Sequence, residues 1–335
     1  MFDFVPTEYF LLIFGFILLI KGGDWFVDAA TSIAKRFKLP ELLIGATVVA
    51  IGTTLPEVMT SAMGAMSGSG EIAYGNAIGS IICNTALIAA ITISIKPGKV
   101  NKKTLIFPAC FFFGAAAFYA VCAYAFGGFE RWSGIVLLSA FVCYMIVNVI
   151  NMKRNPEETL EISEIEEPEE KGSTIGLVKD IGMLVFGAFV IAVGAYLLVE
   201  SATSIAQQLG VPESVIGLTV VAIGTSLPEL VTAITSLIKG HGALSLGNII
   251  GANIFNLVLV SGTAVAINPF DVPMNSMLFG QNASFVLDIP VVFLVMGLMT
   301  VPTLLCGRLK RWQGISLLSI YVLFMLMQFV FVTAV

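Results

Sequence analysis

Ten stretches of apolar residues divide this chain of 335 residues, and they limit it to very few folds. Most contain about 20 residues or more, enough for a helix to cross a hydrocarbon core about 30 Å thick. Barrel strands, the alternative in a bilayer, are about 10 residues long and alternate apolar with polar side chains. The stretches here are continuous, and they predict transmembrane helices at roughly 8–34, 41–66, 72–95, 104–125, 132–152, 176–204, 213–238, 243–267, 283–304 and 312–334.

The composition agrees with a polytopic membrane protein. Hydrophobic residues make up 57% of the chain and charged residues 12%, whereas a soluble domain carries about 25% charged residues. The net charge of −5 comes from residues 156–170, which hold eight acidic side chains and no basic one. We therefore expect the lipid bilayer as a partner and no nucleic acid, and we expect the acidic run to be a solvated linker.

Lysine and arginine residues lie almost entirely in alternate loops. Cytoplasmic loops of membrane proteins carry an excess of these residues. Only Arg131 falls in a loop of the opposite set, and Lys21 falls within the first stretch. The pattern predicts ten spans, both termini outside and a cytoplasmic linker at 153–175; the residues of the basic face are Lys35, Arg36, Lys38, Lys96, Lys99, Lys102, Lys103, Lys153, Arg154, Lys171, Lys179, Lys239, Arg308, Lys310 and Arg311.

The second half of the sequence repeats the first at a constant offset of 172 residues. The motif at 45–84, with GTTLPE and GNAIGSIICN, returns at 217–256 with GTSLPE and GNIIGANIFN. Each half holds five spans, an odd number, so the halves enter the membrane in opposite directions. We expect an all-α membrane protein with ten transmembrane helices in two inverted-topology five-helix repeats, 1–152 and 176–335, an architecture typical of secondary transporters.

Each repeat places a glutamate, Glu57 or Glu229, in the middle of an apolar stretch. Ionisable groups are expensive in hydrocarbon, so such a residue indicates function. Each lies about 17 residues from the end of its helix, close to the membrane midplane at 1.5 Å per residue. One kinked helix with a hydrogen-bonded glutamate would explain a single motif, but the duplication at fixed spacing indicates one shared site.

The prolines before these glutamates predict interrupted helices. Pro56 donates no backbone hydrogen bond, and it disfavours helical geometry at Leu55. We therefore expect free carbonyl oxygens around residues 50–53, and likewise around 222–225 before Pro228. Such backbone is tolerated at membrane depth only where it lines a cavity or is buried in protein.

The polar groups of the two motifs are all oxygen ligands. Calcium and sodium prefer such ligands, whereas zinc and copper prefer His and Cys. The sequence predicts a cation site from the carboxylates of Glu57 and Glu229, the hydroxyls of Thr53, Thr54, Thr225 and Ser226, and the amides of Asn84 and Asn256. The motif glycines Gly75, Gly79, Gly247 and Gly251 predict close helix packing. Asn76 and Asn248 could bond near the site or between helices.

The paired LPE and GN motifs make the chain similar to the sodium/calcium exchanger family of the calcium/cation antiporter superfamily, prokaryotic type. The resemblance implies a ten-helix antiporter of the cytoplasmic (inner) membrane that exchanges sodium for calcium by alternating access. It implies no enzyme activity, no cofactor and no protein partner, with the long first and sixth helices sliding to gate access.

The resemblance also implies roles for individual residues. Glu57 and Glu229 would bind both calcium and sodium, and Thr53 and Thr225 would give backbone oxygens to calcium. Flanking sodium sites would be lined by Ala50, Thr54, Ser80, Ala222 and Ser226.

Two positions depart from the family pattern. Potassium-dependent relatives carry Asp where this chain has Asn256, which argues against potassium transport. Ser80 is matched by Ala252, so one sodium site would be altered. Two alternatives stay open: a proton/calcium antiporter, although that branch usually has Glu in the GN motif, and a membrane enzyme or channel with an acidic dyad.

The first stretch carries further charges. Lys21 and Asp24 are three residues apart and are expected to pair on one helix face. Asp28 and Glu200 match each other at the repeat offset and would lie near opposite membrane faces, where they could attract cations.

Overall fold

The structure is a computed structural model that describes residues 6–154, 174–208, 222–274 and 276–334. Eight of its helical spans are long and apolar enough to cross a membrane: Thr7–Arg36, Glu41–Met66, Gly70–Ile95, Lys102–Phe126, Arg131–Asn151, Gly176–Ile205, Gly242–Ile267 and Ser284–Cys306. These coincide with eight of the ten expected spans, so the chain is a multi-pass helical membrane protein. Two shorter apolar helices, Leu227–Ile238 and Arg311–Leu326, lie at the remaining positions. The ten-helix count stays a prediction, because residues 213–221 of the seventh span lie outside the described part.

The helices follow one another with short connections. In chain order they are α1 (Pro6–Arg36), α2 (Glu41–Ile44), α3 (Ala50–Met66), α4 (Gly70–Ile82), α5 (Ala90–Ile95), α6 (Lys102–Phe126), α7 (Arg131–Arg154), α8 (Thr174–Gln208), α10 (Ala222–Thr225), α11 (Leu227–Ile238), α12 (Gly242–Phe255), α13 (Ser261–Ile267), α14 (Ile289–Cys306) and α15 (Arg311–Leu326). Wider π-helical turns lie at Gly45–Val49, Cys83–Ala89, Asn256–Val260, Ser284–Asp288 and Met327–Phe331. The first three join α2 to α3, α4 to α5 and α12 to α13, so each of these pairs forms one continuous helix.

Helix ends follow local chemistry. The side chain of Asn101 accepts a hydrogen bond of 2.9 Å from the backbone N–H of Lys103 and begins α6. Gly127 ends the same helix at φ 73°, a left-handed conformation that glycine adopts without steric cost. The loops are thus held short and the helices stay in register.

Five short strands, which the sequence did not predict, join the loops at one end of the bundle. Strand β1 (Gly128–Phe129) pairs with β2 (Phe270–Asp271), and β3 (Ser276–Leu278) pairs with β4 (Gln281–Asn282) and β5 (Val332–Ala334), all antiparallel. At the other end Lys99 and Arg308 form an isolated bridge. Each pairing joins loops that the charge pattern assigns to the same membrane face.

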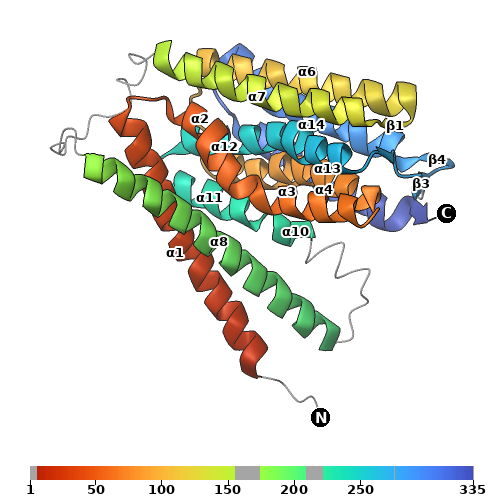
Figure 1. The fold of residues 1–335 in the computed structure, drawn as a ribbon, viewed down its shortest axis with the longest axis horizontal. Helices are drawn as coiled ribbons and strands as arrows, with labels where there is room; N and C mark the ends of the chain where they lie inside the picture. Colours follow the sequence, from red (N-terminus) through yellow and green to blue (C-terminus); the bar gives the residue numbers. More distant parts are fainter. Residues whose placement is uncertain (1–5, 155–173, 209–221, 275, 335) are drawn as a thin grey trace.

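Helix α12 lies in the centre of the bundle, and glycines let it approach its neighbours (Figure 1). A Cβ atom at Gly247 would meet the backbone of Leu42, and one at Gly251 would meet the backbone of Ala46. The expected close packing is confirmed at these two glycines. It is wrong at Gly75 and Gly79, where an added Cβ would meet no atom within 4 Å. Equivalent positions in the two repeats therefore have different surroundings.

Helices α1 and α8 cross each other beside the other helices (Figure 1). Glycines allow this close crossing: a Cβ atom at Gly15 would lie 2.9 Å from the carbonyl oxygen of Gly194, and one at Gly194 would lie 2.9 Å from that of Gly15. The contacts recur at the repeat offset. Gly22 approaches the amide of Ile191 as Gly194 approaches that of Leu19.

We expect Gly194→Val to destabilise the protein by about 1–3 kcal/mol, because the new side chain would collide with the backbone of α1. The measurement is the unfolding temperature of the detergent-purified protein. Gly182→Val is the control, since an added Cβ there meets no atom within 4 Å in the same helix. Equal losses in the two variants would contradict a close α1–α8 crossing.

Candidate cation site

The two repeated glutamates lie in the interior of the bundle. Glu57 is on α3 and Glu229 is in the first turn of α11, and both residues are 0% exposed. They come from different halves of the sequence, and their carboxylates lie close enough to interact electrostatically. The fold therefore brings together the two residues that the sequence suggested as partners.

The backbone before these glutamates differs between the copies. Helix α10 ends at Thr225 and α11 begins at Leu227, so the helix is broken at Ser226, one residue before Leu227-Pro228. The expected interruption is thus found in the second copy. In the first copy the expectation is wrong, because α3 runs from Ala50 to Met66 through Pro56, so Leu55 is helical. The nearest irregular backbone there is the π-helical turn Gly45–Val49, which precedes α3.

Both asparagines that end the GN motifs lie in π-helical turns. Asn84 is the second residue of the turn Cys83–Ala89, and Asn256 is the first residue of the turn Asn256–Val260. A π turn widens the helix locally, and such turns are frequent at functional sites. The wider turn is therefore a shared feature of the two copies, and it holds the asparagine side chains in the bundle interior, where both are 0% exposed.

Hydroxyl groups from the first copy contact polar groups of the second. The Thr54 hydroxyl donates a hydrogen bond of 3.4 Å to Oε1 of Glu229. The Thr53 hydroxyl lies 3.2 Å from Oδ1 of Asn248 and donates to it. The amide of Asn76 donates to the backbone oxygen of Glu57 at 3.0 Å, and so it ties α4 to α3. The open question about Asn76 and Asn248 is thus answered: both bond between helices, directly beside the glutamates.

Several buried polar atoms at this place have no hydrogen-bond partner among the described residues. They are Oε1 and Oε2 of Glu57, Oε2 of Glu229, the side-chain oxygen and nitrogen atoms of Asn84 and Asn256, and Oγ of Ser226. An unpaired buried polar group costs about 1–3 kcal/mol, and a charged group costs more. Most of these atoms are oxygens with free lone pairs, and a hard cation would satisfy them.

The other predicted site residues lie in the same helices. Thr53 and Thr54 are buried on α3 with Ala50, and Ser80 is buried on α4. Thr225 is half-buried at the end of α10. Ala222 begins α10, but its side chain lies outside what the structure describes.

Two residues near the site were not predicted to take part in it. Cys83 precedes Asn84, and its thiol lies beside Ser226 and Tyr321. The Asn253 amide donates to the Thr85 hydroxyl at 2.7 Å and so joins α12 to the π-helical turn that holds Asn84. Adjacency to a predicted ligand is the only sequence signal for Cys83. Asn253 carries none, because its partner is 168 residues away.

Comparison with known proteins identifies a family. The family model described as "Sodium/calcium exchanger protein" matches residues 7–150 and 179–330. The sodium/calcium exchanger MaX1 of Methanosarcina acetivorans is 30% identical over 97% of this chain and 99% of its own length. The uncharacterized membrane protein MJ0091 of Methanocaldococcus jannaschii is 35% identical over 94% of this chain and 95% of its own.

Solved structures agree with the sequence relatives. The sodium-calcium exchanger NCX_Mj, soaked with sodium and strontium, superposes with a TM-score of 0.78 and 32% identity over 95% of this chain and 97% of that chain. The relatives named sodium/calcium exchangers are transporters and not enzymes. The resemblance carried by the LPE and GN motifs is thereby confirmed, and the chain belongs to the sodium/calcium exchanger protein family.

Proposed function

We propose that the chain exchanges sodium for calcium across the cytoplasmic membrane by alternating access, at one midplane site shared by Glu57 and Glu229. The observation that carries this proposal is the cluster of buried oxygens without partners, which both halves contribute. Two carboxylates together carry about two negative charges, which one divalent cation balances. Sodium ions that compete for the same oxygens would couple the two fluxes.

Each predicted residue has a role in this proposal. Glu57 and Glu229 bind both cations, Thr53 and Thr225 give backbone oxygens to calcium, and the amides of Asn84 and Asn256 complete the oxygen shell. Sodium ions occupy flanking positions lined by Ala50, Thr54, Ser80, Ala222 and Ser226. The burial of Thr53, Thr54, Ser80, Asn84 and Asn256 around the glutamates supports this assignment. No cofactor is needed, since the transported ions are the substrates.

The proposed architecture is an inverted pair of five-helix repeats, 1–152 and 176–335, joined by the acidic linker 153–175. Support comes from the crossing of α1 with α8, where glycines separated by 172 residues make matching contacts. Two helices related by a twofold axis in the membrane plane would contact each other in this reciprocal way. The excess of basic residues in alternate loops supports both termini outside and a cytoplasmic linker.

The main rival is a proton/calcium antiporter, since carboxylates can exchange protons as well as cations. The lack of a glutamate in either GN motif favours sodium. Among the other class of function, an enzyme is excluded by the transporter relatives, and a channel would give downhill flux without exchange.

In liposomes containing the purified protein, we expect calcium-45 uptake when sodium is inside and absent outside. Uptake should persist with a proton uncoupler, because sodium supplies the driving force. Uptake that ignores sodium and collapses with the pH gradient would instead indicate a proton/calcium antiporter. Calcium entry without any counter-ion would indicate a channel.

We expect Glu57→Gln and Glu229→Gln each to abolish calcium flux while the protein stays folded. In the native protein, calcium at about 100 times its Kd should stabilise the fold by about 2.7 kcal/mol, measured as a rise in unfolding temperature. Both variants should lose this rise. Glu130→Gln is the control, because Glu130 is exposed in the loop before α7. Normal flux in either site variant would refute a shared site.

We expect Asn256→Asp to tighten cation binding at least several-fold and to admit potassium, because it adds a third carboxylate to the site. Calorimetry with calcium, sodium and potassium measures the affinities. The control Asn268→Asp places the same charge in an exposed loop. If the two variants bind every cation alike, Asn256 does not face the bound ion.

A further inference from the structure

Helices α1 and α8 are tied to each other near both ends by matching contacts. The Ser32 hydroxyl donates to Oδ2 of Asp180 at 2.8 Å. The Ser204 hydroxyl donates to Oε1 of Glu8 at 3.4 Å. Both partners of the second contact correspond to those of the first at the offset of 172 residues. With the glycine crossing between them, these contacts make the two helices a single unit, which we call the α1–α8 pair.

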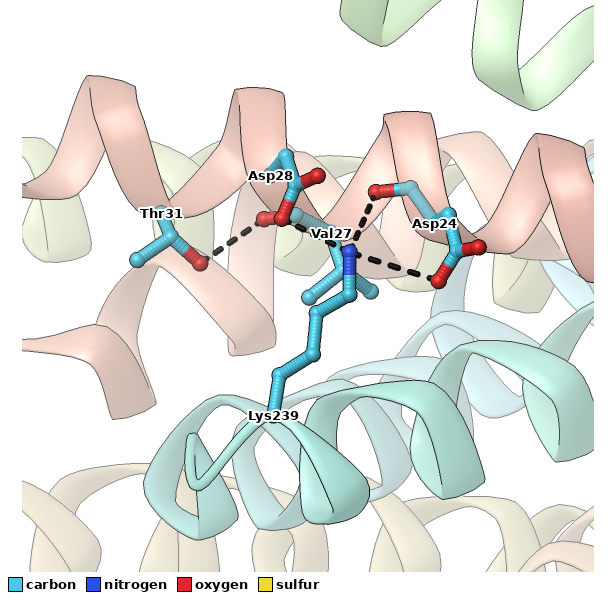
Figure 2. Close-up of polar contacts among 5 residues, drawn as sticks. All are labelled: Asp24, Val27, Asp28, Thr31 and Lys239. Atoms are coloured by element: carbon cyan, nitrogen blue, oxygen red, sulfur yellow. Dashed lines mark hydrogen bonds and ion pairs between the residues drawn. The ribbon is translucent and has the colours of Figure 1, made fainter.

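One lysine joins the α1–α8 pair to the rest of the bundle. Lys239 ends α11, and its ammonium group lies 2.7 Å from Oδ1 of Asp28 and 3.3 Å from Oδ1 of Asp24. It also donates to the backbone oxygen of Asp24 at 3.1 Å. Figure 2 shows the side chain reaching from the end of α11 to these oxygens on one face of α1. The expected pair of Lys21 with Asp24 is therefore wrong, because Asp24 contacts Lys239 instead.

This ionic contact has no equivalent at the matching position of the other repeat. Lys239 corresponds to Ser67 and Asp24 to Tyr196, and only Asp28 is matched by an acid, Glu200. The Ser67 hydroxyl donates to the backbone oxygen of Gly64 at 2.9 Å, within its own helix. The ammonium group is therefore present at one membrane face alone, the basic face defined by the loop charges.

Coverage by the α1–α8 pair is also one-sided. On the stretch of α11 between Glu229 and Lys239, Val231 and Thr235 are half-buried, and a Cβ atom at Gly23 of α1 would meet both side chains. The equivalent residues on α3, Met59 and Met63, are 64% and 67% exposed. The described conformation is thus closed along α11, towards the basic face, and less covered along α3.

We propose that Lys239 is a positioning residue of the exchange cycle: by holding Asp24 and Asp28 it latches the α1–α8 pair over α11 and favours the state closed at the basic face. The proposal rests on the alternating access proposed above. A slide of α1 by one helical turn, about 5.4 Å, would pull at least one carboxylate out of hydrogen-bond reach of the ammonium group. A contact made in one state alone shifts the equilibrium between states by its own strength.

The first test needs no transport. Hydrogen–deuterium exchange of the full chain in nanodiscs compares the native protein with Lys239→Met, which keeps an unbranched stem without the charge. We expect faster exchange at the basic-face ends of α1 and α11 and, reciprocally, slower exchange around residues 66–70 at the opposite face. The double variant Asp24→Asn/Asp28→Asn should change exchange in the same directions, and Lys239→Arg should restore the native pattern.

The control breaks a different ion pair at the same face. Arg36 lies 3.3 Å from Oδ2 of Asp180, within the α1–α8 pair, and its match in the other repeat is Gln208. Arg36→Gln should therefore leave the balance between the faces unchanged. If Lys239→Met accelerates exchange at its own face with no reciprocal slowing, the lysine only stabilises structure locally and the proposal is overturned.

The second test uses transport, where side-specific affinity separates gating from general damage. In oriented vesicles we expect Lys239→Met to raise apparent calcium affinity at the basic face and to lower it at the opposite face, each by roughly threefold to tenfold. Equal changes at both faces would overturn the latch. If no variant, nor the native protein, exchanges sodium for calcium while the reciprocal deuterium pattern appears, the latch stands and the proposed cargo is wrong.

Discussion

Two carboxylates held out of water at one place constrain the rest of this structure. Transfer of a charged group from water into a protein interior costs several kcal/mol even after the protein relaxes, unless an opposite charge is present. Among the described residues, the groups around Glu57 and Glu229 are hydroxyls, amides and a thiol, which are neutral. The charge must therefore be balanced by something that the protein binds and releases, and the oxygen-rich surroundings select hard cations. Burial of an uncompensated pair is a liability for stability and a requirement for transport.

The helices around this pair follow from the need to deliver oxygens to one point. A regular helix uses its backbone carbonyls internally, so a helix that contributes to an ion site must be broken or widened. The chain does both, with a break at Ser226 and π-helical turns at Asn84 and Asn256. The close packing of α12 through Gly247 and Gly251 then excludes lipid from the irregular backbone. Duplication supplies two such elements, and inversion would let one site face either side of the membrane in turn.

The sequence predicts the apolar spans, the family and the meeting of Glu57 with Glu229, because each depends on composition or on a motif present twice. It fails where the two copies differ. Pro56 and Pro228 follow the same residue pattern, yet α3 continues through Pro56, while α10 ends before Pro228. Gly75 and Gly247 also match, but only Gly247 packs against a backbone. The contact of Asp24 with Lys239 spans 215 residues, beyond any local rule. Repeats share sequence, and their environments are set by whichever helices happen to lie beside them.

The most direct test of a shared site is the location of a bound ion. Strontium, a heavier analogue of calcium with an anomalous signal, can be soaked into crystals of the purified protein and located without any phase bias from the chain. The account predicts an anomalous peak between α3 and α11 with oxygens of both Glu57 and Glu229 within about 2.6 Å, or slightly more for the larger ion. A peak that contacts only one of the two glutamates, or that lies elsewhere in the bundle, would contradict it.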